Sequence, residues 1–184
     1  MVSQFVSPDK HRLLGDLNFD FPEGTHAIGR LDEESEGLLL LSTDKSLTRR
    51  LLHPTKKHRR SYFVLVNRVV TAETLEQLRS GIDILVQGKG AYRTQPCEVT
   101  IVEKPLQLPD HPNGFNDSFP HTWLRFELAE GKKRQIRKMC KALKHSVLRL
   151  IRTSINDLYI GNMHPGEVRE MEREELFKLL KLNA

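Results

Sequence analysis

The chain has 184 residues and a formal net charge of +5, and its length is typical of one domain. No stretch approaches the roughly 18 consecutive apolar residues of a membrane helix, and no charged-then-apolar signal segment opens the chain, so we expect a cytoplasmic protein without membrane association. Cys97 and Cys140 have no further cysteines at ligand spacing, which argues against a disulfide-rich secreted fold and a zinc ribbon.

The apolar segments, taken in chain order, predict mostly short strands with a few helices among them. Residues 1–24 show no clear pattern, 30–36 form a polar turn, and 104–120, with four prolines, form a loop. The expected elements are strands at 26–29 and 38–41, a helix from 45, a strand at 61–66, a helix from 72, strands at 82–86, 97–102 and 123–128, a helix over 132–144, a strand at 147–155 and a helix at 170–182. Because strands outnumber helices and do not alternate regularly with them, the sequence predicts an α+β fold.

Three of these helices carry end signals or a clear inward face. Asp44 closes a Ser-Thr-Asp cluster that offers an N-cap, Thr71 caps the next helix, and Gly81 stands where a left-handed residue ends it. The helix over 132–144 has apolar residues at the core-facing spacing, namely Ile136, Met139, Cys140 and Leu143. Cys140 is therefore expected in the core rather than as a nucleophile.

The net charge conceals two basic segments. Residues 49–60 contain six Lys and Arg and residues 132–152 contain nine, with no acidic residue in either segment, which leaves 14 basic against 24 acidic residues elsewhere. If the two segments meet in space, they form the electrostatic footprint of a polyanion-binding protein. The alternative is two solvated faces that never meet. A membrane-surface helix is less favoured, because the helix over 132–144 has no aromatic residue.

The turn between the first two expected strands is unusually acidic, with four carboxylates between Gly29 and Gly37. On spacing alone a solvated loop is favoured. Glycine at each end permits sharp bends or close backbone approach, so the turn could also present one carboxylate to a functional site. The histidines have no recognisable ligand spacing with the cysteines, so we expect no metal site.

Three motifs in the expected order resemble those of the RNA pseudouridine synthases of the ribosomal small/large-subunit branch. They are Gly-Arg-Leu-Asp-x-x-Ser-Glu-Gly-Leu-Leu-Leu-Leu at 29–41, Arg-Ser-Tyr-Phe-Val at 60–64 and Glu-Gly-Lys-Lys-Arg-Gln-Ile-Arg-Lys-Met at 130–139, followed by Leu-Arg-Leu-Ile-Arg at 148–152. The Pro-rich segment before Thr122 makes the match closest to members that act on the large subunit. The resemblance implies a mixed, mostly antiparallel central sheet flanked by helices.

The resemblance also assigns roles to single residues. Asp32 matches the catalytic aspartate, which acts as a nucleophile or as an electrostatic and general-base partner. Tyr62 matches the tyrosine that stacks on the target base, and Arg137 the basic residue that pairs with the aspartate, since a nearby cation lowers a carboxylate's pKa. Arg30 and Leu150 are expected to line the substrate pocket. The implied reaction converts a uridine of 23S ribosomal RNA to pseudouridine without cofactor or metal.

The chemistry needs a flipped-out base, so the basic segments would hold the flanking phosphates. The expected RNA-binding residues are Arg49, Arg50, Lys56, Lys57, Arg59, Arg60, Lys132, Lys133, Arg134, Lys138 and Lys141. The expected partner is 23S ribosomal RNA or a large-subunit assembly intermediate, bound by a monomer.

The resemblance predicts one catalytic domain over 1–184, with a C-terminal helical extension over 170–184. It leaves no room for the N-terminal RNA-binding domain, of the ribosomal-protein S-four type, that many relatives carry. Two other functions remain open at this stage. One is a non-catalytic RNA-binding or ribosome-assembly protein with the same fold, and the other is a nuclease that uses the acidic turn with a divalent metal.

Overall fold

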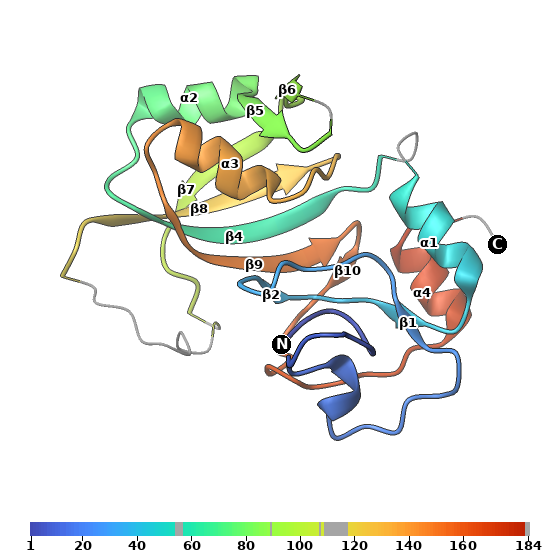
Figure 1. Ribbon diagram of the computed structural model, residues 1–184. Coiled ribbons are helices and arrows are strands. Elements are labelled where there is room, and N and C mark those ends of the chain that lie inside the picture. Colours follow the sequence, from blue (N-terminus) through green and yellow to red (C-terminus); the bar gives the residue numbers. More distant parts are fainter. Residues whose placement is uncertain (54–56, 89, 107, 109–117, 183–184) are drawn as a thin grey trace.

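The computed structural model describes the chain except residues 54–56, 89, 107, 109–117 and 183–184. The central sheet is mixed but mostly antiparallel, in the order β10-β9-β4-β8-β7, and β2 pairs in parallel with β9 (Figure 1). Its strands are β2 (Glu36–Gly37), β4 (Arg60–Asn67), β7 (Glu98–Val102), β8 (His121–Leu128), β9 (Val147–Ile155) and β10 (Leu158–Tyr159). The expected α+β fold is confirmed.

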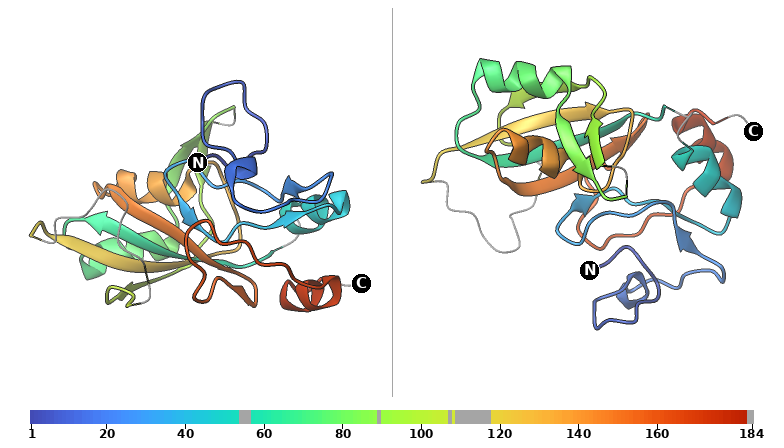
Figure 2. Two further views of the ribbon diagram at one scale, coloured as in Figure 1. Left: turned by 90° about the horizontal axis from the view of Figure 1, so that it is seen from below. Right: turned by 45° about the horizontal axis from the view of Figure 1, so that its top comes forward.

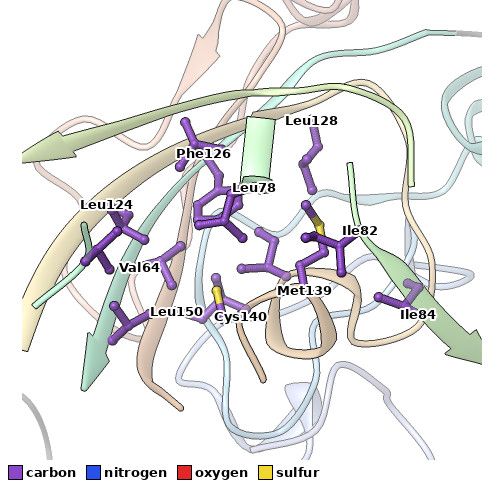
Figure 3. Close-up of a cluster of buried hydrophobic side chains, with 14 residues drawn as sticks. Val64, Leu78, Ile82, Ile84, Leu124, Phe126, Leu128, Met139, Cys140 and Leu150 are labelled. Atoms are coloured by element: carbon purple, nitrogen blue, oxygen red, sulfur yellow. The ribbon is translucent and has the colours of Figure 1, made fainter. Parts of the chain in front are cut away.

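One side of the sheet is covered by α2 (Ala72–Ser80), α3 (Gln135–Ala142) and the hairpin of β5 (Asp83–Val86) and β6 (Gly90–Arg93). Figure 3 shows Met139 and Cys140 of α3 packed among the side chains of β4, β8 and β9. The helical spacing predicted this face, and both residues are buried. Cys140 is therefore a core residue, and burial raises the pKa of its thiol to about 12.

A second core lies at one end of the sheet, where α1 (Lys45–Leu52) and α4 (Arg173–Leu179) pack side by side (Figures 1 and 2). Leu47 and Leu51 point inward from α1, and Phe177 does so from α4. The Asp44 side chain caps α1 by accepting from the Ser46 amide at 2.8 Å, so the predicted start of this helix is confirmed. A short 3₁₀ helix, η1 (Leu14–Asp16), lies in the otherwise irregular N-terminal segment.

The expected continuous strand at 38–41 is wrong. The chain turns away from β9 past Gly37, which has a φ of 104°, with one last backbone bond from the Leu38 amide to Arg152. It then pairs with β1 (His26–Ala27) in β3 (Leu41–Ser42). Leu38 and Leu40 remain buried in the second core, which explains why the segment is apolar although it is not one strand.

Two other expectations need correction at chain reversals. Gly81 ends α2 with φ 93° and ψ 151°, which is not the left-handed helical conformation, because the chain turns there so that the Ile82 amide reaches the Thr94 hydroxyl at 2.8 Å. The last helix ends at Leu179 rather than 182, because Lys181 has a φ of 55° and the Leu182 amide bonds back to the Phe177 carbonyl oxygen. Strand β6 was not foreseen.

We expect Leu47→Ala to lower the free energy of unfolding by about 2–4 kcal/mol, because it removes a fully packed side chain from the second core. Leu52→Ala on the same helix is the matched control. Its side chain is 43% exposed, so the change should stay within about 0.5 kcal/mol. Urea denaturation of both variants measures the difference, and equal losses would contradict a core between α1 and α4.

Candidate active site

The turn that carries Asp32 is attached to the central sheet through β2, which pairs with β9 on the side opposite β4. Glu36 and Gly37 pair with Ile151 and Arg152 of β9, and the Leu38 amide donates to the Arg152 carbonyl oxygen at 2.8 Å. A side chain on Gly37 would overlap the Arg152 backbone. Position 37 therefore needs glycine both for its positive φ and for this close approach.

Two arginines of β9 hold the turn from the strand side. Arg149 is buried and donates through Nε and Nη2 to the two carboxylate oxygens of Glu36, each at 2.8 Å. Arg152 is also buried, and its Nε donates to the Leu38 carbonyl oxygen at 2.8 Å. Burial lowers the pKa of Arg152, and the neighbouring Tyr62 opposes this shift. Paired guanidinium groups of this kind fix a loop in one orientation.

A third arginine, Arg137 of α3, holds the turn from the helix side. Its Nη2 donates to the Glu34 carbonyl oxygen at 2.7 Å and lies 3.4 Å from the Ser35 hydroxyl. Its Nη1 donates to the Val147 carbonyl oxygen at 3.3 Å. Burial lowers the pKa of Arg137, whereas the charges of Glu34 and Asp32 raise it. Arg137 is therefore within electrostatic reach of Asp32.

The expected direct pairing of Arg137 with Asp32 does not occur in this structure. Among the described residues the carboxylate within 4.0 Å of the Arg137 guanidinium is that of Glu34, at 3.7 Å. The reason is local geometry, because the turn closes by a bond from the Ser35 amide to the Asp32 carbonyl oxygen at 2.8 Å, which brings Glu34 toward α3. Arg137 thus holds the backbone next to the aspartate.

The N-terminal segment contributes one further support. The Ser3 hydroxyl accepts from the Leu31 amide at 3.0 Å and lies 3.2 Å from the Leu31 carbonyl oxygen. The residue immediately before Asp32 is therefore fixed by a segment in which the sequence showed no pattern. Arg30 next to it is exposed.

Tyr62 and Leu150 lie on neighbouring strands close to this turn. In the register of β4 and β9, Tyr62 is opposite Arg152 and Val64 is opposite Leu150, and such cross-strand partners share a face of the sheet. Tyr62 is half-buried and packs against the main core, whereas Leu150 is 7% exposed. Tyr62 thus lies across β9 from Gly37 of β2, and Arg137 contacts Glu34 and Ser35, which follow Asp32 in the turn.

The two basic segments do meet in space. Arg60 Nη1 lies beside Gly131, 3.7 Å from where a Cβ atom on that glycine would be. Arg60 Nη2 donates a hydrogen bond to the Leu51 carbonyl oxygen at 3.2 Å. The start of β4 thus joins the end of α1 to the segment before α3. Arg134 and Arg137 of the second basic segment lie beside the turn that carries Asp32.

Several of the expected RNA-binding residues also make contacts within the protein. Arg59 pairs with Glu127 at 2.6 Å, Lys138 donates to the Leu85 carbonyl oxygen at 2.7 Å, and Arg134 pairs with Glu34 at 2.8 Å. The side chain of Arg50 lies over the Phe177 ring, and that of Lys132 over the Tyr92 ring. Arg49, Lys57, Lys133 and Lys141 are exposed, and Lys56 lies outside the described residues.

Within the described part of the chain, no three His, Cys, Asp or Glu side chains are arranged to hold a metal ion. In that same part, no helix has the length and apolar character needed to cross a membrane. The side chains expected at the site offer a carboxylate, a phenol and several guanidinium groups.

Comparison with known sequences identifies the family. A model of the RNA pseudouridylate synthase family matches residues 11–142. The chain is 34% identical over 173 residues to ribosomal large subunit pseudouridine synthase E of Vibrio parahaemolyticus, covering 93% of this chain and 69% of that protein. It is 37% identical over 170 residues to the protein of the same name from Xanthomonas axonopodis, covering 90% and 85%. The chain therefore belongs to the RNA pseudouridylate synthase family, which is a family of isomerases.

A crystal structure of pseudouridylate synthase has a similar fold, with a TM-score of 0.69 and 26% identity. The similarity covers 88% of this chain and 63% of that one, so this chain spans a little under two thirds of the crystallised protein. The resemblance expected from the three motifs is thus confirmed, including its likeness to the E-type members that act on the large subunit.

No individual role follows from the sequence for Glu34, Glu36, Arg149 and Arg152, although they hold the turn in place. One signal was available for the two arginines, because charged residues within an apolar strand need partners when they are buried. Ser3 had no such signal, since a serine in an unpatterned segment can point anywhere.

We expect Glu36→Gln to lower the free energy of unfolding by about 2 kcal/mol, because it leaves the buried Arg149 without its carboxylate. Glu76→Gln is the control, since it breaks an ion pair between exposed side chains. The Glu76 side chain is 72% exposed and that of its partner Arg79 is 41% exposed. That change should cost less than about 0.5 kcal/mol. Thermal or urea unfolding of both variants gives the comparison, and a neutral Glu36→Gln would contradict a structural role for the pair.

Proposed function

We propose that this protein isomerises a specific uridine of 23S ribosomal RNA to pseudouridine, with Asp32 as the essential carboxylate. The observation that supports this most is the position of Asp32 in the motif turn, with Tyr62 opposite Arg152 on the next strand and Arg137 within electrostatic reach. The names of the relatives from Vibrio and Xanthomonas support the large-subunit substrate.

In the proposed reaction the glycosidic bond between the ribose and N1 of uracil breaks, and the uracil rotates. A new bond then forms from the same ribose carbon to carbon 5 of the base. The proton on carbon 5 is lost to a base and N1 gains a proton, so atoms balance without an oxidant or reductant. Asp32 acts either as a nucleophile or as an electrostatic and general-base partner of the ribose. Neither role needs a cofactor.

The protein contributes orientation and charge to this step. A base stacked in a helix cannot turn over, so the nucleotide must leave the stack, and the Tyr62 ring would replace the lost stacking. Arg137 holds the backbone of the turn two residues after Asp32. The exposed cations of the two basic segments neutralise the phosphates on either side, which makes binding salt-dependent. Arg30 and Leu150 would line the base pocket.

Other parts of the proposal concern the setting. We propose that residues 1–184 form one catalytic unit, that the protein acts as a cytoplasmic monomer, and that its substrate is either free 23S RNA or a large-subunit assembly intermediate. Mapping pseudouridine by carbodiimide-dependent primer extension in cells lacking the protein would identify the target uridine. If these cells keep every pseudouridine of their 23S RNA, the large-subunit assignment is wrong.

We expect Asp32→Asn to abolish tritium release from [5-³H]uridine-labelled large-subunit RNA, because the amide can neither attack the ribose nor accept a proton. Filter binding should show that the variant still binds RNA. If the variant releases tritium as fast as the native protein, Asp32 is not catalytic. If the native protein binds RNA and releases no tritium, it is a non-catalytic RNA-binding protein, and shortened RNA would instead indicate a nuclease.

We expect Tyr62→Phe to preserve RNA affinity within about twofold and to lower the rate of tritium release, because the ring can still stack while the hydroxyl is lost. Tyr62→Ala should also weaken binding, since stacking of one base on an aromatic side chain contributes about 1–3 kcal/mol. Full activity of Tyr62→Ala would rule out a stacking role.

A further inference from the structure

One carboxylate of the acidic turn lies between the cations of the third motif. Arg134 Nη2 donates to Glu34 Oε2 at 2.8 Å, and Arg137 Nε lies 3.7 Å from the same oxygen. Arg137 Nη2 holds the Glu34 carbonyl oxygen at 2.7 Å. Two guanidinium groups from the start of α3 thus converge on one acidic residue, two positions after Asp32.

This contact differs from the other ion pair of the turn. The Glu34 and Arg134 side chains are 60% and 40% exposed, whereas Arg149, which pairs with Glu36, is 4% exposed. Exposed pairs contribute at most about 1 kcal/mol, so another anion can displace Glu34 at little cost. The hydrogen bond from Arg134 holds the pKa of Glu34 below its ordinary value, so the carboxylate is ionised at neutral pH and competes as an anion.

The cations are arranged before any ligand arrives. Arg134 has a φ of 56° and ψ of 35° at the N-cap of α3, a left-handed conformation that is strained for a non-glycine residue. The side chain of Arg137 is 11% exposed, and within the described part of the chain its buried Nε has no hydrogen-bond partner. A tetrahedral phosphate carries the same charge as the carboxylate and more acceptor oxygens, so it could satisfy both guanidinium groups together.

We propose that Arg134 and Arg137 form a subsite for one backbone phosphodiester of the RNA, and that Glu34 occupies this subsite in the free protein as an internal competitor. The inference rests on the proposed function, because it places the phosphate beside the nucleotide that reaches Asp32. RNA binding then exchanges a carboxylate for a phosphate, while Arg137 stays within electrostatic reach of Asp32.

Glu34→Gln tests the subsite, because glutamine keeps the shape of the side chain and removes the competing charge. We expect it to tighten binding of a fluorescein-labelled single-stranded oligouridine by about three- to fivefold at low salt, the upper part of the range that corresponds to displacing an exposed ion pair. The slope of log affinity against log salt should be the same as for the native protein, because the same number of RNA phosphates is neutralised in both. Fluorescence anisotropy measures both quantities.

Glu33→Gln is the matched control. It removes the same charge from the neighbouring position, but the Glu33 carboxylate faces His11 at 3.2 Å and not the two arginines. We expect an affinity change below about twofold for this variant. The double variant Glu34→Gln, Arg134→Gln should lose the gain in RNA affinity, because the subsite then lacks the guanidinium group that pairs with Glu34 in the native protein.

Equal tightening in Glu33→Gln and Glu34→Gln would mean general charge repulsion and would overturn the subsite, as would weaker binding by Glu34→Gln. The test is independent of catalysis, since oligouridine binding requires no isomerisation. A gain in affinity without any tritium release by the native protein would leave the subsite standing and refute the proposed function. Normal tritium release with no gain would refute the subsite alone.

Discussion

The contact between Gly37 and the backbone of Arg152 is the constraint on which the rest of the site depends. Only a residue without a side chain can lie so close to β9, and this approach lets β2 pair in parallel with the strand. Once the pairing is made, Glu36 reaches Arg149 and the Leu38 carbonyl oxygen reaches Arg152. The position of Asp32 follows from these contacts, because the turn is held by β9 on one side and by Arg137 of α3 on the other.

The acidic turn uses carboxylates of one chemical type for different purposes. Glu36 forms a bidentate pair with an arginine buried in the sheet, so losing that pair leaves a buried charge without its carboxylate. Glu34 pairs at the surface, where water and other anions compete for the same guanidinium groups. Asp32 makes no such ion pair among the described residues. The two glutamates differ in the burial of the arginine that each one pairs with. The carboxylate paired with the buried Arg149 is structural, whereas the one paired with the exposed Arg134 can be replaced by another anion.

The sequence predicted what depends on local pattern. The periodic spacing of Ile136, Met139 and Cys140 was enough to place the inner face of α3, because one helix face repeats regularly along the chain. Asp32 was found only through a motif, since by composition it was one of four acids in a turn. The pairing of Glu36 with Arg149 was not legible, because it joins residues 113 positions apart through strand pairing that no local pattern encodes.

An irregularity in β9 brings the aromatic ring and the buried cation together. Ser61 pairs with Ser154, yet Tyr62 pairs with Arg152, so Thr153 has no counterpart in β4. Such a bulge changes which face the following side chains occupy. Without it Tyr62 would face Thr153, and Arg152 would lie opposite Phe63 in the layer that contains Leu65 and Trp123. Because of the bulge, the strand that holds the acidic turn also places a guanidinium group beside the tyrosine, so one irregular residue couples two of the motifs.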